Sequence, residues 1–105
     1  MATILITEAL SAKAHRLKSE YSANAAVIIM GDFNDVPEVM LKSRAINKLP
    51  HPDSTAYPHQ ILTFCLDNSV GTVFVLNERE IKALEPALQL FFEYDIEIQL
   101  VKNDL

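Results

Sequence analysis

The sequence predicts an α/β fold, a Rossmann-like three-layer domain with a small, mostly parallel sheet of about four strands. Two observations support this prediction. Short segments rich in β-branched residues alternate along the chain with segments whose apolar residues recur at helical spacing. The second of the short segments is apolar at every position, which is typical of a strand covered on both faces. Strands that alternate with helices favour a parallel sheet with right-handed crossovers and helices on both faces.

The first half of the chain is expected to form two strands with a helix between them. Thr3–Ile6 is a β-branched run and Ala26–Met30 is the apolar one, so each predicts a strand. The helix is predicted by four apolar residues on one face: Leu10, Ala14, Leu17 and Tyr21. Thr7 is a candidate cap for this helix, and the spacing of Asp35 and Glu38 predicts a short second helix that starts at residue 36.

A proline-rich segment and a further helix occupy the middle of the chain. Lys48–Pro58 contains three prolines and is expected to be irregular or extended. A helical apolar pattern follows, in which Pro58 is tolerated in the first turn. The residues of that pattern are Tyr57, Ile61, Phe64 and Leu66. Thr72–Leu76, directly after Gly71, is apolar and β-branched and predicts the third strand.

The last third of the chain predicts a broken helix and an edge strand. Asn77 and Glu80 have the spacing of a helix cap and its partner, and Pro86 is expected to kink or break the helix near Glu85. The apolar face of this helix consists of Ile81, Leu84, Leu88 and either Phe91 or Phe92. Ile96–Val101 alternates between apolar and polar residues, which predicts a strand with one solvated face at the edge of the sheet.

Composition limits the classes of partner. The chain has 105 residues, half of them hydrophobic, which is enough for a single domain over residues 1–105. Its net charge of −5 argues against a nucleic acid and against an anionic membrane surface. No apolar run has the length of a membrane span, and the N-terminus lacks the basic segment of a signal peptide. The single cysteine is typical of a reducing compartment, so a cytoplasmic location is expected.

The candidate ligand site follows from the predicted topology. In open α/β sheets, ligands bind outside the carboxyl ends of the strands. The residues expected there are Thr7, Glu8, Asp32, Asn34, Asn77 and Glu78. This acidic rim suits an amine-bearing ligand or a magnesium ion better than a free phosphate. The sequence contains no complete catalytic constellation, so it predicts no catalytic residue, no cofactor and no metal site, and it favours a protein that is not an enzyme.

Other residues that carry chemistry have structural interpretations. His51, Asp53 and His59 form the only cluster of histidine with aspartate, but they lie in the proline-rich segment and are expected to be solvated. Cys65 is expected to be a small buried apolar residue, since no histidine lies near it in the sequence.

The C-terminal region suggests self-association. Phe91, Phe92 and Tyr94 make the last helix apolar on more than one face, so one phenylalanine is expected in the core and the other in an interface. The exposed edge strand Ile96–Val101 offers a second route to pairing. The sequence therefore favours a homodimer.

The segment Gly31–Asn34 matches a motif of the endonuclease/exonuclease/phosphatase family. In that family, residues at the positions of Asp32 and Asn34 help to hold a divalent metal and to orient the attacking water. The family's Asp-His pair is absent from this sequence, and its larger antiparallel sandwich is incompatible with alternating strands and helices. A turn that ends a strand and caps the next helix is therefore the favoured interpretation, and a metal-dependent phosphoesterase is the alternative.

The chain also resembles the N-terminal domain that precedes the ATP-grasp fold in carboxylate–amine ligases, such as the large subunit of carbamoyl phosphate synthase. The resemblance is strongest in ILTFCLDNSVGTVFVLNEREIKALEPALQLFFEYDIEIQLV, which is similar to the family's helix, apolar strand, acidic helix start and final strand. Phe91, Phe92, Ile96 and Ile98 stand where the family has a phenylalanine at a helix end and its final strand. The first half, with ILIT and VIIMGD, agrees more loosely.

This resemblance implies a non-catalytic module. ATP chemistry in the family belongs to the domains that follow, so the chain is expected to be a split-off leading domain that works with a separately encoded ATP-grasp ligase. The first turn departs from the family, because Glu8 and Ala9 stand where a glycine-rich turn is usual. With only Gly31 and Gly71 in the chain, no loop is expected to hold a phosphate by close backbone approach. A degenerate domain kept for oligomerisation is a further alternative.

Overall fold

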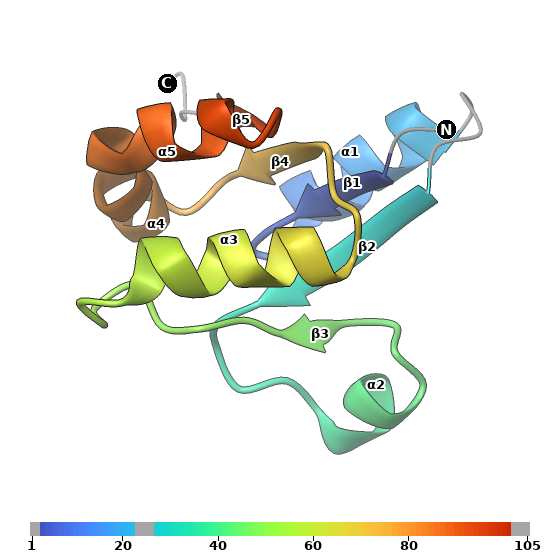
Figure 1. Ribbon diagram of the computed structural model, residues 1–105. Coiled ribbons are helices and arrows are strands. Elements are labelled where there is room, and N and C mark those ends of the chain that lie inside the picture. Colours follow the sequence, from blue (N-terminus) through green and yellow to red (C-terminus); the bar gives the residue numbers. More distant parts are fainter. Residues whose placement is uncertain (1–2, 23–26, 102–105) are drawn as a thin grey trace.

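The chain folds around a five-stranded parallel sheet with the order β3-β2-β1-β4-β5 (Figure 1). The structure is a computed structural model that describes residues 3–22 and 27–101. This arrangement confirms the Rossmann-like α/β prediction, with one strand more than expected. The elements are β1 (Thr3–Ile6), α1 (Ala12–Ser22), β2 (Val27–Asp32), α2 (Glu38–Lys42), β3 (Asn47–Lys48), α3 (Tyr57–Asp67), β4 (Thr72–Val75), α4 (Glu78–Leu84), the 3-10 turn η1 (Glu85–Ala87), α5 (Leu88–Glu93) and β5 (Glu97–Leu100).

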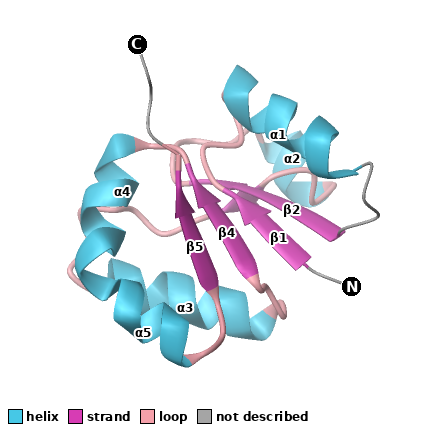
Figure 2. Ribbon diagram, turned by 90° about the horizontal axis from the view of Figure 1, so that it is seen from above, coloured by secondary structure: helices cyan, strands magenta, loops and turns pink. Residues whose placement is uncertain are grey.

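Helices cover both faces of the sheet. Seen from above, α1 and α2 lie on one side of the strands, and α3, α4 and α5 lie on the other (Figure 2). The alternation of side chains along each strand explains why both faces are apolar. In β1, Ile4 and Ile6 point to the side of α1, whereas Leu5 points to the side of α3. The sheet is therefore the middle layer of three.

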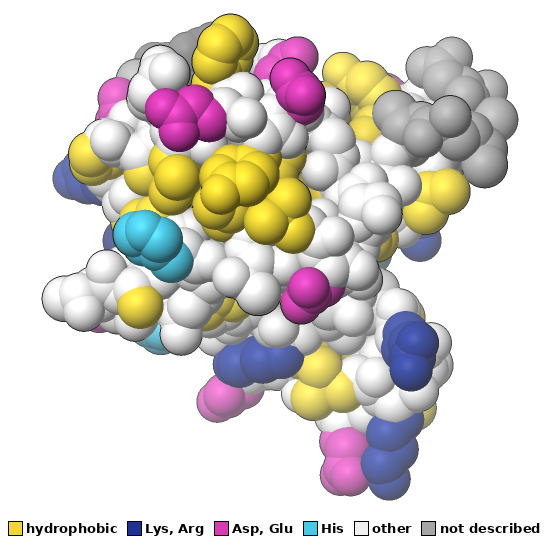
Figure 3. Space-filling view, viewed as in Figure 1, with side chains coloured by type: hydrophobic (Ala, Val, Ile, Leu, Met, Phe, Trp, Pro, Cys, Tyr) yellow, Lys and Arg dark blue, Asp and Glu magenta, His cyan; other side chains and the backbone are white. Residues whose placement is uncertain are grey.

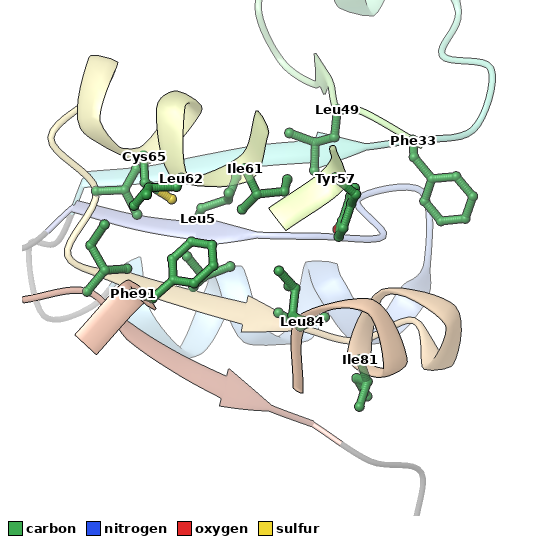
Figure 4. Packing of buried hydrophobic residues seen from close by; sticks show 14 residues of the cluster. Leu5, Phe33, Leu49, Tyr57, Ile61, Leu62, Cys65, Ile81, Leu84 and Phe91 are labelled. Carbon is green, nitrogen blue, oxygen red and sulfur yellow. The ribbon is translucent and has the colours of Figure 1, made fainter. Parts of the chain in front are cut away.

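The larger core lies between the sheet and α3, α4 and α5 (Figure 4). Its fully buried members from the sheet are Leu5, Val73 and Val75, and those from the helices are Tyr57, Ile61, Cys65, Leu84 and Phe91. Burying a side chain of this size stabilises the fold by about 1.5–3 kcal/mol. The smaller core, on the side of α1, includes Ile4, Ile6, Ala14, Met30 and Phe74. Cys65 is thus a core residue, as the sequence predicted.

Two predicted helix caps are wrong. Helix α1 begins at Ala12 and not directly after the first strand, and the hydroxyl of Ser11, not that of Thr7, accepts a hydrogen bond from the N–H of Ala14. Helix α2 begins at Glu38 after Pro37, and no side chain caps it. Asp35 therefore does not act as a cap, and the segment after β2 does not cap the next helix.

Strand boundaries agree more closely with the predictions. Strand β1 covers the predicted residues, and β4 ends one residue before the predicted end. Strand β2 continues through Gly31 to Asp32, two residues further than expected, because these two residues pair with β3. Ala26, the predicted first residue of this strand, lies outside the described residues. Strand β3 was not predicted, because a strand of two residues has no periodicity to detect.

The C-terminal half follows the predicted pattern with two exceptions. Pro86 ends α4 and begins a 3-10 turn, so the predicted break is confirmed. Phe91 is buried, whereas Phe92 is 74% exposed. Strand β5 lies at the edge of the sheet, as predicted. The first exception is Leu66, which is 49% exposed, because Leu62 and Cys65 form the buried face of α3 instead. The second is Leu88, which was expected on the apolar face of the last helix and is exposed. None of the described helices is long and apolar enough to cross a membrane.

Candidate functional site at the carboxyl edge of the sheet

The strand order reverses between β1 and β4. From β1 the chain moves outward to β2 and β3, and it then crosses to β4 and β5 on the opposite side of β1. The loops that leave β1 and β4 therefore run to helices on opposite faces of the sheet, and they separate at the carboxyl ends of these two strands. Rossmann-like domains bind their ligands at this point. Thr7 and Glu8 follow β1 and Asn77 follows β4, so three of the six predicted site residues lie in these two loops, and a fourth, Glu78, is the first residue of α4.

Thr7 joins the ends of the two strands. Its backbone N–H and its hydroxyl both donate to the carbonyl of Phe74, at 3.0 and 3.2 Å, and the hydroxyl accepts from the N–H of Leu76 at 3.1 Å. Thr7 is fully buried. Its hydroxyl therefore closes the gap between β1 and β4 beyond their ladder, and this bond is what keeps Thr7 from capping α1.

Glu8 and Asn77 connect the two loops across the point of reversal. Glu8 is half-buried and has a backbone φ of 54°, in the left-handed region that is uncommon for glutamate. Burial raises the pKa of its carboxyl group, and the charge of Asp32 raises it further, whereas a hydrogen bond from Asn77 and the charge of Lys13 lower it. Asn77 also caps α4, since its side-chain oxygen accepts from the N–H of Arg79 at 2.9 Å.

Asp32 fixes the turn between β1 and α1. Its carboxylate is buried and accepts three hydrogen bonds, from the N–H of Leu10 at 3.1 Å, from the N–H of Asn34 at 2.9 Å and from the Asn34 side chain at 3.0 Å. Asn34 is exposed. Because the donors come from its own loop and from the neighbouring turn, the Gly31–Asn34 segment makes a local structural network.

Glu78 is the one predicted site residue that the structure does not bring to the others. Its side chain is exposed, and its carboxylate lies 3.9 Å from the ammonium group of Lys82, one helical turn further along α4. Such an exposed pair within a helix contributes only a few tenths of a kcal/mol. Glu78 therefore lies on the solvated face of α4.

Sequence reasoning missed Glu80, which is fully buried. One of its carboxyl oxygens, Oε2, accepts a hydrogen bond from the hydroxyl of Tyr57, and the other, Oε1, is buried without a hydrogen-bond partner. Tyr57 of α3 and Leu84 of α4 lie on facing sides of the larger core (Figure 4), so the bond ties α3 to α4. The spacing from Asn77 had suggested the role of a capping partner. Glu80 is also four residues before the buried Leu84, and that spacing is a signal for burial.

The surroundings of Glu80 change its ionisation. Burial raises its pKa from the ordinary value of 4.5 to about 7, and the charges of Asp32 and Glu8 act in the same direction. The hydroxyls of Tyr57 and Thr7 lower it. Burial and the Glu80 carboxylate likewise raise the pKa of Tyr57. We refer to Thr7, Glu8, Asp32, Asn77 and Glu80 as the carboxyl-edge cluster.

An ion pair joins the proline-rich segment to helix α4. Asp53 pairs with Arg79, lies 3.7 Å from His51 and is exposed. Arg79 lies 5.9 Å from the centre of the Phe33 ring, against which His51 packs edge-on. Of the three residues that the sequence grouped together, His51 and Asp53 thus lie side by side at the surface and are joined to α4, whereas His59 is exposed on α3. No group of three or more histidine, cysteine, aspartate or glutamate residues in the described segments is arranged to hold a metal ion.

A second surface feature lies beside the edge strand β5. A groove of about 330 Å³ runs between α5 and β5 and is lined by Leu88, Gln89, Phe92, Ile96, Glu97 and Ile98. Hydrophobic side chains also gather between α3 and the α4–α5 segment, with acidic side chains beside them (Figure 3). Phe92 and Tyr94 are the most exposed aromatic residues in this region.

In comparisons with known proteins, no family model matches the sequence, and no curated protein matches it.

Proposed function

We propose that this protein is a non-catalytic ligand-binding module that works with an ATP-grasp ligase, as the N-terminal domains of carboxylate–amine ligases do. The observation that carries the proposal is the meeting of Glu8 and Asn77 across the ends of β1 and β4, where the strand order reverses. Ligands bind to Rossmann-like domains at this point. The left-handed backbone of Glu8 supports the proposal, since strained residues gather where ligands are held.

The structure favours this function over a metal-dependent phosphoesterase. In the phosphoesterase reading, Asp32 and Asn34 would turn their oxygen atoms toward a metal ion. Here Asp32 accepts three hydrogen bonds from nitrogen atoms, one of which belongs to the Asn34 side chain. A carboxylate that accepts three hydrogen bonds has few lone pairs left to coordinate a metal ion. These hydrogen bonds therefore give the residues of the Gly31–Asn34 motif a structural role.

An assembly role is supported by a separate observation, the groove between α5 and β5. Phe92 lies in this groove and is 74% exposed, and β5 is an edge strand of the sheet in the part of the chain that the structure describes. Exposed aromatic residues beside an open strand edge are typical of protein–protein contacts. We therefore include self-association, or contact with the ligase, as the second part of the proposal.

The ligand-binding part is tested by two-dimensional NMR of the labelled chain. Magnesium chloride, ATP, glycine and glutamate are added in turn, and the amide signals of residues 7–10 and 76–81 are followed. A ligand of this site shifts these signals in a saturable manner, and Asn77→Ala weakens its binding. Glu78→Gln is the matched control, because it removes a neighbouring carboxylate that lies on the solvated face of α4. Equal effects of the two substitutions would contradict the proposed site.

The assembly part is tested by light scattering of the chain alone and mixed with an ATP-grasp ligase from the same operon. A joint complex that is lost in Phe92→Ser supports a partner surface at the groove. A homodimer that is lost in the same variant, and that ignores the ligase, supports self-association instead. A monomer under both conditions would refute the assembly role.

A further inference from the structure

The Oε1 atom of Glu80 stands out within the described residues as a buried side-chain atom without a hydrogen-bond partner. Buried polar atoms in folded proteins are almost always paired, because leaving one unpaired costs about 1–3 kcal/mol. A donor that comes from outside the chain would remove this cost.

The neighbours of Glu80 define which kind of donor is missing. The charged groups that act on its carboxyl group are Asp32 and Glu8, and both are carboxylates. The remaining contacts are hydroxyl groups, from Tyr57 and Thr7. Three carboxyl groups, from β2, from the turn after β1 and from α4, thus influence one another electrostatically, and Lys13 acts on one of them, Glu8. A positively charged donor would reduce the repulsion between them.

The same residues discriminate between possible cations. A metal ion needs several oxygen ligands that converge on one point at 2.0–2.6 Å or so. The described carboxylates do not converge in this way, and Asp32 is already used by three N–H donors. An ammonium group has several N–H donors that point in different directions, each reaching an acceptor at about 2.8 Å. Acceptors that are spread around a site are therefore better suited to an ammonium group than to a metal.

We propose that the carboxyl-edge cluster binds the primary ammonium group of a small ligand, with Oε1 of Glu80 as the inner acceptor and the Glu8 carboxylate as the outer one. The ligand enters past Glu8 and Asn77, the two half-buried members of the cluster. This inference rests on the proposed function, because it names the class of ligand that the same edge of the sheet takes. It gives the buried glutamate a role beyond the hydrogen bond that it accepts from Tyr57.

The experiment uses 1-butylamine, which is an ammonium ion at neutral pH, with 1-butanol as the uncharged control of the same length. NMR titration at pH 8 is expected to give saturable shifts of the amide signals of residues 7–8 and 77–81 with the amine and none with the alcohol. Glu80→Gln is expected to weaken binding at least about tenfold, the loss of one hydrogen bond between charged groups. Glu85→Gln, which removes an exposed carboxylate one turn further on, is expected to bind as the unmodified chain does.

Binding is also expected to weaken as the pH is lowered from 8 to 6. The reason is that protonation of Glu80, whose pKa is about 7, competes with the ammonium group. The Glu80→Gln variant should lack this dependence, and its spectrum shows independently that it is folded. Equal shifts with the alcohol, or unchanged binding in Glu80→Gln, would overturn the inference. If the amine has no effect but magnesium chloride or glutamate shifts the same signals, the ammonium inference fails while the proposed binding function stands. If none of them has an effect, both fail.

Discussion

The buried carboxyl group of Glu80 makes a defined prediction about stability and pH. In the folded chain its pKa is about 7, whereas an unfolded chain has the ordinary value of 4.5. Between these values the folded state holds a proton that the unfolded state has released. The free energy of unfolding therefore falls as the pH rises from 4.5 to 7. The rise from 4.5 to about 7 corresponds to about 3 kcal/mol, at about 1.4 kcal/mol for each tenfold change in proton affinity.

Glu80→Gln isolates this contribution, because glutamine keeps the size of the side chain but has no proton to lose. Relative to this variant, the unmodified chain is expected to lose about 3 kcal/mol of stability between pH 5 and pH 8. With a urea dependence of about 1.5 kcal/mol per molar, the difference between their unfolding midpoints changes by about 2 M over this range. Circular dichroism at a series of urea concentrations measures both midpoints.

Glu85→Gln is the control for this measurement, since it removes an exposed carboxylate from the adjoining turn. The difference between Glu85→Gln and the unmodified chain should be nearly constant across the pH range. A constant difference for Glu80→Gln as well would show that the carboxyl group titrates alike in the folded and unfolded chains. A difference of the opposite sign would mean that a cation lies beside the group.

Three further substitutions, two of them with a matched control, test the packing around the site and the C-terminal helix. Gly31→Ala places a methyl group 2.7 Å from a buried leucine side chain and is expected to cost about 1–3 kcal/mol of unfolding free energy, whereas Gly71→Ala meets no atom within 4 Å and should change it little. Tyr57→Phe removes the hydroxyl that donates to the buried carboxyl group and should cost about 1–3 kcal/mol, more at pH 8 than at pH 5, so equal losses would count against this bond. Phe91→Ala should cost about 3–5 kcal/mol and Phe92→Ala less than about 0.5 kcal/mol in urea unfolding, and similar values would show that the buried phenylalanine is misassigned.

Strands β1 and β4 could be predicted from the sequence because they are buried on both faces. Thr3–Ile6 and Thr72–Val75 consist of β-branched and large apolar residues, so their local preference and their place in the fold agree. Strand β3 consists of Asn47 and Lys48 only, and it exists because these residues pair with the end of β2. Such a strand depends on its partner and not on its own sequence, so it could not be predicted.

The helix caps show how tertiary contacts override a local signal. Asn77 caps α4 as its sequence predicts, because its side-chain oxygen accepts the hydrogen bond from the N–H of Arg79. Thr7 has the residue type of a cap, but its hydroxyl bridges β1 and β4, and Ser11 caps α1 instead. Glu80 has the spacing of a capping partner, but the same position lies on the buried face of α4. A sequence pattern gives each of these residues two uses, and only the packing of the sheet selects one.

The exclusion of phosphate has a physical basis that differs from the one the sequence suggested. The sequence argument was that the first turn lacks glycine. In the structure, three backbone N–H groups of that turn are already engaged: those of Thr7 and Ala9 donate to carbonyl groups of the neighbouring strands, and that of Leu10 donates to the carboxylate of Asp32. Phosphate binding at such a turn depends on free N–H groups. A glycine in place of Glu8 would therefore restore the backbone freedom of the turn without freeing these donors. A ligand at this edge must instead meet side-chain carboxylates, which is why its chemistry is expected to be that of a cation.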